Sequence, residues 1–217
     1  MPVDVILSWP RACDYPLWRK FLAENRHRFA RVLIVFTHQE GEDYSRFVAE
    51  TLGDLAECYD SPPPQLDWRY TAVNFALDKS DAEYVWFTEQ DFFVTDPSFW
   101  DELTGDAAGW LESDRWHPSS LWVKRALIEQ TTRYFGTPPV DHFWQFGGEL
   151  EALTPIHEIK SGFRHMQGVS HNHYLIHAGI EDGIFRRDQF REYLRASLRA
   201  GVPLHPIWEA EARRELE

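Results

Sequence analysis

The chain contains little cysteine and no long apolar run, and each shortage excludes a class of protein. Its 217 residues include only two cysteines, Cys13 and Cys58, without the spacing of metal ligands. We therefore expect neither a disulfide framework nor a zinc site built on cysteine. The longest apolar runs, such as 32–36, are far too short to cross a bilayer, and the N-terminus has no basic region. The sequence predicts a cytoplasmic protein without a secretion signal or a membrane span.

Basic residues are scarce relative to acidic ones. The sequence carries 22 lysines and arginines against 35 aspartates and glutamates, which gives a formal net charge of -13. A strongly negative protein repels polyphosphate chains, which disfavours non-specific binding to nucleic acid or to an anionic membrane. Aromatic residues are abundant by contrast, at 15% of the chain. We expect most of these rings in the core and some along a groove for sugars, bases or partners.

The first half of the sequence alternates between strand and helix patterns. Apolar or β-branched runs predict strands at 3–9, 31–37, 57–60 and 84–88. Charged, periodic stretches predict helices at 15–29, 43–52 and 67–77. This order is typical of right-handed βαβ crossovers in a doubly wound, mostly parallel sheet. Ligands of such sheets bind beyond the carboxyl ends of the strands, so residues that follow the strands are the first candidates for a site.

Two carboxylates follow the fourth predicted strand. Glu89, Gln90 and Asp91 come directly after the apolar run 84–88. Carboxylates spaced i and i+2 at a strand end suit a hard cation, and Mg²⁺ or Mn²⁺ held there can bridge a nucleotide diphosphate and help it leave. The alternative is a solvated acidic turn, but the apolar strand before the pair and the aromatic residues after it indicate a packed turn. The sequence therefore predicts a divalent-metal site here.

Three segments of the chain together resemble the GT-A family of nucleotide-sugar glycosyltransferases. One helix of that family is similar to 67–77, and its strand ending in a DxD motif is similar to 82–91. The helix that follows the motif is similar to 96–100. The resemblance extends over about residues 3–104. The chain departs from the family at Glu89, which stands in place of the first Asp of the motif.

The resemblance implies a glycosyltransferase of the hexosyltransferase type, with a uridine diphosphate sugar as the expected donor and a hydroxyl group as the acceptor. Asp91 would bind the metal, Glu89 would contact the metal or the ribose, and Gln90 would lie with them in the donor site. Further residues that the resemblance places near the base or the diphosphate of the donor are Thr37, Asp60 and Arg69. Each of these three also has a plain alternative, as a strand-end cap or a surface cation.

A single inverting displacement requires a base across the site from the leaving diphosphate. The family supplies it from an acidic motif at a helix start, and 141–151 is the stretch with that character. Glu149 is the first candidate, because it follows two glycines that would let a ligand approach closely, and Asp141 is the second. The alternative for Glu149 is a helix N-terminal carboxylate favoured by the helix dipole.

Histidines gather in the last third of the chain. Imidazole is a good ligand for Mn²⁺-like ions, and the resemblance implies a C-terminal histidine on the metal. His171 and His173 are the candidates, as alternatives to each other rather than as a two-histidine zinc site. Either one has a plain alternative as an ordinary polar residue.

We expect a single domain, 1–217, with a nucleotide-binding half at 1–104 and a less regular acceptor half at 105–217. The acceptor half is predicted to end in an amphipathic helix near 187–199 with arginines along one edge. That edge leaves a DNA acceptor open, since some viral members of the family modify hydroxylated bases. The net charge favours a small-molecule or glycan acceptor instead.

Two other functions compete with sugar transfer. A nucleotidyltransferase of a related α/β fold is disfavoured, because the segment 8–11 after the first strand lacks the glycines such enzymes carry there. A non-catalytic module that binds a nucleotide sugar or a glycan is the third interpretation, and the glutamate in the DxD position makes it conceivable.

Overall fold

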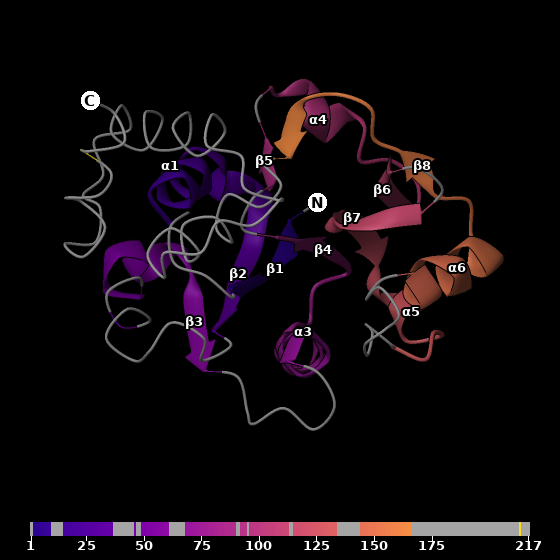
Figure 1. Cartoon of the computed structure of the whole chain (residues 1–217), viewed down its shortest axis with the longest axis horizontal. Helices are drawn as coiled ribbons and strands as arrows, with labels where there is room; N and C mark the ends of the chain where they lie inside the picture. Colours follow the sequence, from indigo (N-terminus) through magenta and orange to yellow (C-terminus); the bar gives the residue numbers. More distant parts are fainter. Residues whose placement is uncertain are drawn as a thin grey trace.

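The computed structural model has a mixed α/β fold built around a seven-stranded sheet (Figure 1). The residues that it describes are 2–9, 15–36, 46, 49–60, 68–89, 92–94, 96–112, 115–133, 144–165 and 213.

The sheet has the strand order β3-β2-β1-β4-β7-β6-β8. Its strands are β1 (Val3–Trp9), β2 (Phe29–Phe36), β3 (Glu57–Asp60), β4 (Tyr84–Thr88), β6 (Ala107–Glu112), β7 (Arg115–Lys124) and β8 (His157–Glu158). Neighbouring strands are parallel from β3 to β4, β6 is parallel to β8, and β7 is antiparallel to β4 and β6. The predicted mostly parallel sheet is thus confirmed. A second, two-stranded antiparallel sheet pairs β5 (Phe92–Val94) with β9 (Phe163–His165).

Helices occur close to two of the predicted positions, 15–29 and 67–77, with shifted boundaries, and part of the predicted helix 43–52 lies outside the described residues. The helices are α1 (Tyr15–Asn25), α3 (Trp68–Lys79), α4 (Ser98–Asp101), α5 (Arg125–Ile128) and α6 (Trp144–Leu153), with 3-10 turns η1 (Arg26–Arg28) and η2 (Gly53–Leu55). The predicted helix 15–29 is too long at its end. The turn η1 terminates it, and Phe29 begins β2 because its ring packs into the aromatic core, 5.8 Å from that of Phe21.

The core lies on both faces of the sheet. On one face, α1 and α4 cover a cluster centred on the fully buried Trp86, whose ring contacts those of Trp18 and Phe99. On the other face, α3 and α6 cover a second cluster that includes Phe87 and Phe146. Figure 1 shows α1 and α4 on one side of the sheet and α3, α5 and α6 on the other. Successive residues of β4 therefore feed opposite cores, as the alternation of a strand requires.

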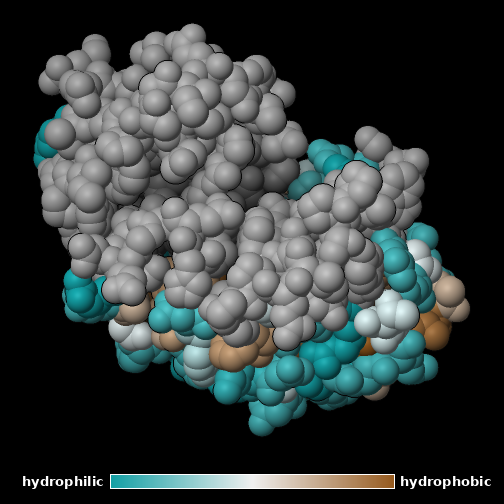
Figure 2. Space-filling model, turned by 60° about the horizontal axis from the view of Figure 1, so that its bottom comes forward, coloured by the Kyte–Doolittle hydropathy of each residue, from teal (hydrophilic) through white to brown (hydrophobic). Residues whose placement is uncertain are grey.

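The described surface is mostly polar. In Figure 2 the coloured atoms are largely hydrophilic, with small apolar patches between them. Among the large hydrophobic side chains that the structure describes, Leu153 alone is exposed. None of the described helices is both long enough and apolar enough to span a membrane.

The described part of the second half also contains regular elements. It contributes the long β6–β7 hairpin, α5, α6 and two short strands to the described fold. The amphipathic helix expected near 187–199 lies outside the described residues.

Candidate active site

The carboxyl ends of β1 to β4 meet at one edge of the sheet. The register places Leu7 of β1 beside Thr88 of β4, and Trp9 beside Phe36 of β2. Asp60, the last residue of β3, lies beside Phe36 as well. Because these four strands are parallel, the segments that follow them leave the sheet at the same edge, where α/β sheets bind their ligands.

The acidic segment 89–91 begins from a fixed strand end. All of β4 is buried, and Thr88 pairs with Ser120 of β7, which is buried too. The Ser120 hydroxyl accepts a hydrogen bond of 3.2 Å from the indole N–H of Trp86. Glu89 is the next residue and is half-buried. The first carboxylate of the pair therefore leaves the sheet from a rigid position.

The other flank of the acidic segment is anchored too. The backbone N–H of Phe92 donates to the carbonyl of Glu89 at 3.2 Å, which is the i to i+3 hydrogen bond that closes a β-turn. The Phe92 ring is buried and stacks on Phe163 of β9, with 4.8 Å between ring centroids. The described residues on both sides of the acidic segment, Glu89 and Phe92, are therefore anchored, and anchors of this kind reduce the ordering cost of binding.

Sequence reasoning missed Gly162, which lets β9 approach the start of α4. Its φ is +75°, and a Cβ placed on it would lie 2.5 Å from the backbone nitrogen of Phe99. Its carbonyl accepts a hydrogen bond of 3.1 Å from the backbone N–H of Asp96. The glycine thus supports the β5–β9 pair that anchors the acidic segment. A glycine between two short strand patterns is a turn signal that points to such a position.

The remaining donor-site candidates belong to the same edge by connectivity. Asp60 is exposed at the end of β3. Arg69 is in the first turn of α3, and α3 returns the chain from the carboxyl end of β3 to the start of β4, so this turn is the part of α3 nearest the edge. Thr37, Gln90 and Asp91 lie outside the described residues.

Glu149 lies inside α6, in its second turn, rather than at the helix start. The glycine pair before it is helical, and Gly147 is buried against Trp116, where an added Cβ would come within 3.2 Å of the indole ring. Gly147 therefore serves helix packing, whereas Gly148 is exposed with nothing within 4 Å of an added Cβ. The alternative base, Asp141, lies outside the described residues.

Both oxygens of the Glu149 carboxylate accept hydrogen bonds. Oε2 accepts from the backbone N–H of Thr132 at 2.7 Å, and Oε1 accepts from the Thr132 hydroxyl and from Gln145 Nε2, each at 2.8 Å. Partial burial alone would raise the pKa of Glu149, but the hydrogen bonds from Gln145 and Thr132 together lower it below its usual value. Glu149 is thus held as a carboxylate with its acceptor sites engaged by the protein itself.

No group of three or more His, Cys, Asp or Glu side chains within the described part of the chain is arranged to hold a metal. Of the predicted metal ligands, Asp91, His171 and His173 lie outside that part, and Glu89 is described. A carboxylate at the edge of the sheet fits Mg²⁺ or Mn²⁺, because these ions often take only one or two protein carboxylates together with substrate phosphates.

The β6–β7 hairpin extends past the same edge, which the sequence analysis did not predict. Ser120 is level with Thr88, so His117, three residues earlier in β7, lies about 10 Å further along the strand direction at 3.3 Å per residue. Here His117 is buried, its ring is 4.5 Å from that of Trp110, and its Nε2 lies 3.4 Å from Glu112 Oε2. The hairpin therefore places a histidine, a tryptophan and a carboxylate beyond the carboxyl end of β4.

Comparison with protein-family models and with curated proteins gives no match to this chain. Solved structures do match in fold. The mannosyltransferase PcManGT from Pyrobaculum calidifontis, in complex with GDP-Man and Mn²⁺, has a TM-score of 0.52 and 15% identity over 99% of this chain and 68% of its own. Glucosyl-3-phosphoglycerate synthase from Mycobacterium tuberculosis, in complex with phosphoglyceric acid, has a TM-score of 0.53 and 11% identity over 84% of this chain and 81% of its own.

These likenesses define the class of fold. The chain has the GT-A-like α/β fold of the two enzymes, with a central, mostly parallel sheet. At such low identities the similarity extends to the fold and not to a donor, a metal or an acceptor.

Proposed function

We propose that this chain is a metal-dependent glycosyltransferase that moves a sugar from a nucleoside diphosphate donor, expected to be a uridine one, to an acceptor hydroxyl. The observation that carries the proposal is the acidic segment 89–91, anchored on both flanks at the carboxyl edge of a GT-A-like sheet. Support comes from the two fold neighbours, a mannosyltransferase with GDP-Man and Mn²⁺ and a glucosyl-3-phosphoglycerate synthase.

The donor is proposed to bind across the carboxyl edge of β1 to β4. Asp91 and Glu89 would hold Mn²⁺ or Mg²⁺, with His171 or His173 as a further ligand, and Gln90 would lie beside the donor. When bound, the metal neutralises charge on the diphosphate and so makes it a better leaving group. The residues proposed to contact the nucleotide are Thr37, Asp60 and Arg69.

The acceptor is proposed to bind between this edge and the second half of the chain. In a single displacement, an acceptor oxygen bonds to the anomeric carbon as the bond to the diphosphate breaks, and a carboxylate takes the hydroxyl proton. Asp141 and Glu149 are the two candidates for that base. The hydrogen bonds that engage Glu149 favour Asp141, because a base must offer a lone pair to the acceptor.

Donor hydrolysis tests the proposal most simply. A panel of nucleotide sugars is incubated with the protein, with Mn²⁺ and with excess chelator, and released nucleoside diphosphate is measured. We expect release from at least one donor, dependent on the ion and reduced in Asp91→Asn. If no nucleotide sugar is hydrolysed but one raises the melting temperature by mass action, the chain is a binding module and not an enzyme.

A further inference from the structure

The turn of residues 131–133, here called the bridging turn, joins α3 to α6 through polar contacts. It follows α5, where the Thr131 hydroxyl donates to the carbonyl of Ile128 at 2.7 Å. The same hydroxyl oxygen accepts from the backbone N–H of Arg133 at 3.1 Å. Arg133 has a φ of 52°, a left-handed conformation that is unfavourable for a residue with a Cβ. Contacts from both neighbouring helices therefore have to hold the turn in place.

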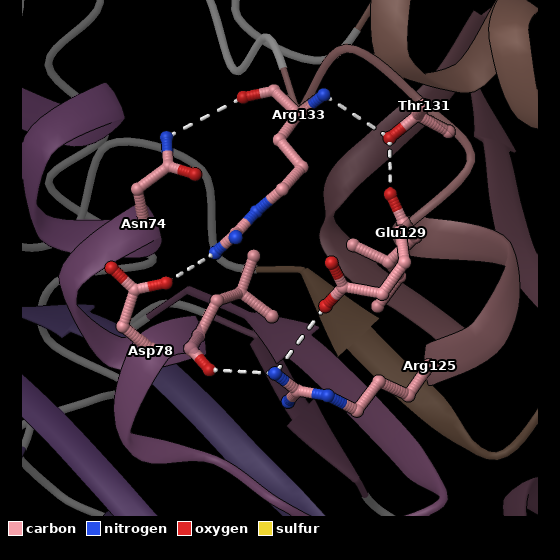
Figure 3. A network of polar contacts seen from close by, with 8 residues as sticks. Asn74, Asp78, Arg125, Glu129, Thr131 and Arg133 are labelled. Carbon is pink, nitrogen blue, oxygen red and sulfur yellow. Dashed lines mark hydrogen bonds and ion pairs between the residues drawn. The ribbon is translucent and has the colours of Figure 1, made fainter.

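On one side, the bridging turn is tied to α3 (Figure 3). Asn74 Nδ2 donates to the carbonyl of Arg133 at 3.4 Å, and the Arg133 guanidinium pairs with Asp78 at 2.9 Å. Nearby, Arg125 bridges the carbonyl of Leu77 and the carboxylate of Glu129, at 3.1 Å and 3.4 Å. The turn and α5 are thus fixed to the helix whose first turn carries Arg69.

On the other side, the bridging turn is tied to α6 by Glu149. This carboxylate accepts both the N–H and the hydroxyl of Thr132, and Gln145 of the same helix donates to it as well. The helix itself is fixed one turn earlier, where Phe146 is fully buried and packs on Phe87, 5.8 Å between centroids. Phe87 directly precedes Thr88, so the chain of contacts from Glu149 ends at the strand that carries the acidic segment.

We propose that Glu149 is a positioning residue of the acceptor half and not its base: it holds the bridging turn against α6. The inference rests on the proposed sugar transfer. The chain leaves the bridging turn toward residues 134–143, which include Asp141, and returns at the start of α6. By joining Thr132 to α6, Glu149 fixes the bridging turn relative to the start of α6. Its effect on transfer is therefore exerted through Thr132.

Three variants separate positioning from base catalysis. Glu149→Gln keeps the length of the side chain and one acceptor oxygen, but its amide nitrogen cannot accept the second Thr132 hydrogen bond. Thr132→Val removes only the hydroxyl contact, and Thr132→Ser is the matched variant that keeps it. Steady-state kinetics are measured with a hydrolysed donor and its acceptor, across a range of pH, well below the melting temperature of each variant.

We expect Glu149→Gln and Thr132→Val to raise the acceptor KM and to lower kcat by about 10-fold, since misplaced groups cost up to about 100-fold. The donor KM should stay unchanged, and Thr132→Ser should restore the wild-type values. The acidic limb of the pH–rate profile should persist in Glu149→Gln, because the titrating base is another group. The double variant should be no worse than either single variant, because both remove the same contact.

Two results would overturn the proposal. In the first, Glu149→Gln lowers kcat by about 100-fold or more and abolishes the acidic limb of the pH–rate profile, while Thr132→Val behaves as wild type. Glu149 would then be the base, since a base contributes about 100-fold to 10,000-fold. The other is unchanged kinetics in both folded variants. If the wild-type protein turns over no donor at all, the proposed function fails. Urea unfolding of the single and double variants then decides whether Glu149 and Thr132 are coupled, because coupled residues shift the unfolding midpoint non-additively.

Discussion

Replacing Gly162 by alanine should destabilise the protein more than the same change at Gly105. Both residues have left-handed backbones, with φ values of +75° and +76°. An added Cβ meets nothing within 4 Å at Gly105, whereas at Gly162 it would lie 2.5 Å from the nitrogen and 2.8 Å from the Cα of Phe99. The pair therefore separates the cost of backbone conformation from the cost of overlap with a neighbouring backbone.

The magnitudes follow from these two terms. A left-handed residue with a Cβ costs about 1–2 kcal/mol, which both variants share. Forcing an extra methyl group into a packed site costs about 1–3 kcal/mol more, and only Gly162→Ala bears this second term, because Phe99 is buried and presents backbone atoms that cannot rotate away. We expect the free energy of unfolding to fall by about 2–5 kcal/mol in Gly162→Ala.

Urea unfolding followed by tryptophan fluorescence measures the difference, with equal m-values as the check that both variants unfold in the same way. The acidic segment offers a second assay, because Gly162 supports β9, and Phe163 of β9 stacks on Phe92. Donor binding in the presence of Mn²⁺ should weaken in Gly162→Ala and not in Gly105→Ala. Stabilities of the two variants within about 0.5 kcal/mol of each other, the usual range of harmless substitutions, would refute the packing role given to Gly162.

Two further predictions concern charge. Hydrogen bonds from Arg31 lower the pKa of Glu57 to about 2; partial burial opposes this shift, and a hydrogen bond from Tyr59 assists it. The ion pair therefore stabilises the fold fully above the unfolded pKa near 4.5, and this stabilisation is lost as the pH falls toward 2. The stability deficit of Glu57→Gln, on the order of 0.5 kcal/mol for this half-exposed pair, should therefore vanish over that interval in urea titrations, and a deficit that is constant with pH would contradict the assignment. Hydroxymethylated duplex DNA should bind weakly, with little dependence on salt, in wild type and in Arg191→Glu and Arg195→Glu, because the net charge of -13 opposes a phosphate backbone. Tight, salt-sensitive binding lost in both variants would instead identify DNA as the acceptor.

The strands β1, β2 and β4 were predictable because they are mostly buried and rich in apolar, β-branched or aromatic residues. The predicted strands 3–9 and 84–88 match β1 and β4 residue for residue, and 57–60 matches β3, which is only partly buried. The β6–β7 hairpin was missed for a physical reason. Its residues follow neither a continuous apolar run nor a regular apolar/polar alternation. Pro118 also lies within β7, where proline normally argues against a strand. Pairing with β4 outweighs that local preference.

The edge of the sheet at which the site is proposed was predictable, whereas the roles of its residues stay predictions. The position of residues after parallel strands follows from topology alone, and the register of β1 to β4 confirms that their ends share one edge. The engagement of Glu149 could not be predicted, because its partner Thr132 is 17 residues away along the chain. The same holds for Gly147, whose packing against Trp116 depends on how α6 lies on β7. Long-range packing of this kind leaves no local pattern.

The measurement that tests the proposed site most directly is calorimetric titration of a nucleotide sugar into wild type and Asp91→Asn, each with Mn²⁺ and with excess chelator. The donor panel described above selects the ligand, and Asp106→Asn, an exposed carboxylate at the opposite end of β6, is the control. We predict that donor binding depends on Mn²⁺ in wild type and in the control. This dependence should be lost in Asp91→Asn, because the carboxylate is proposed to hold the ion against the diphosphate. Equal donor affinity in wild type and Asp91→Asn, or full affinity in excess chelator, would contradict a metal-diphosphate site at residues 89–91.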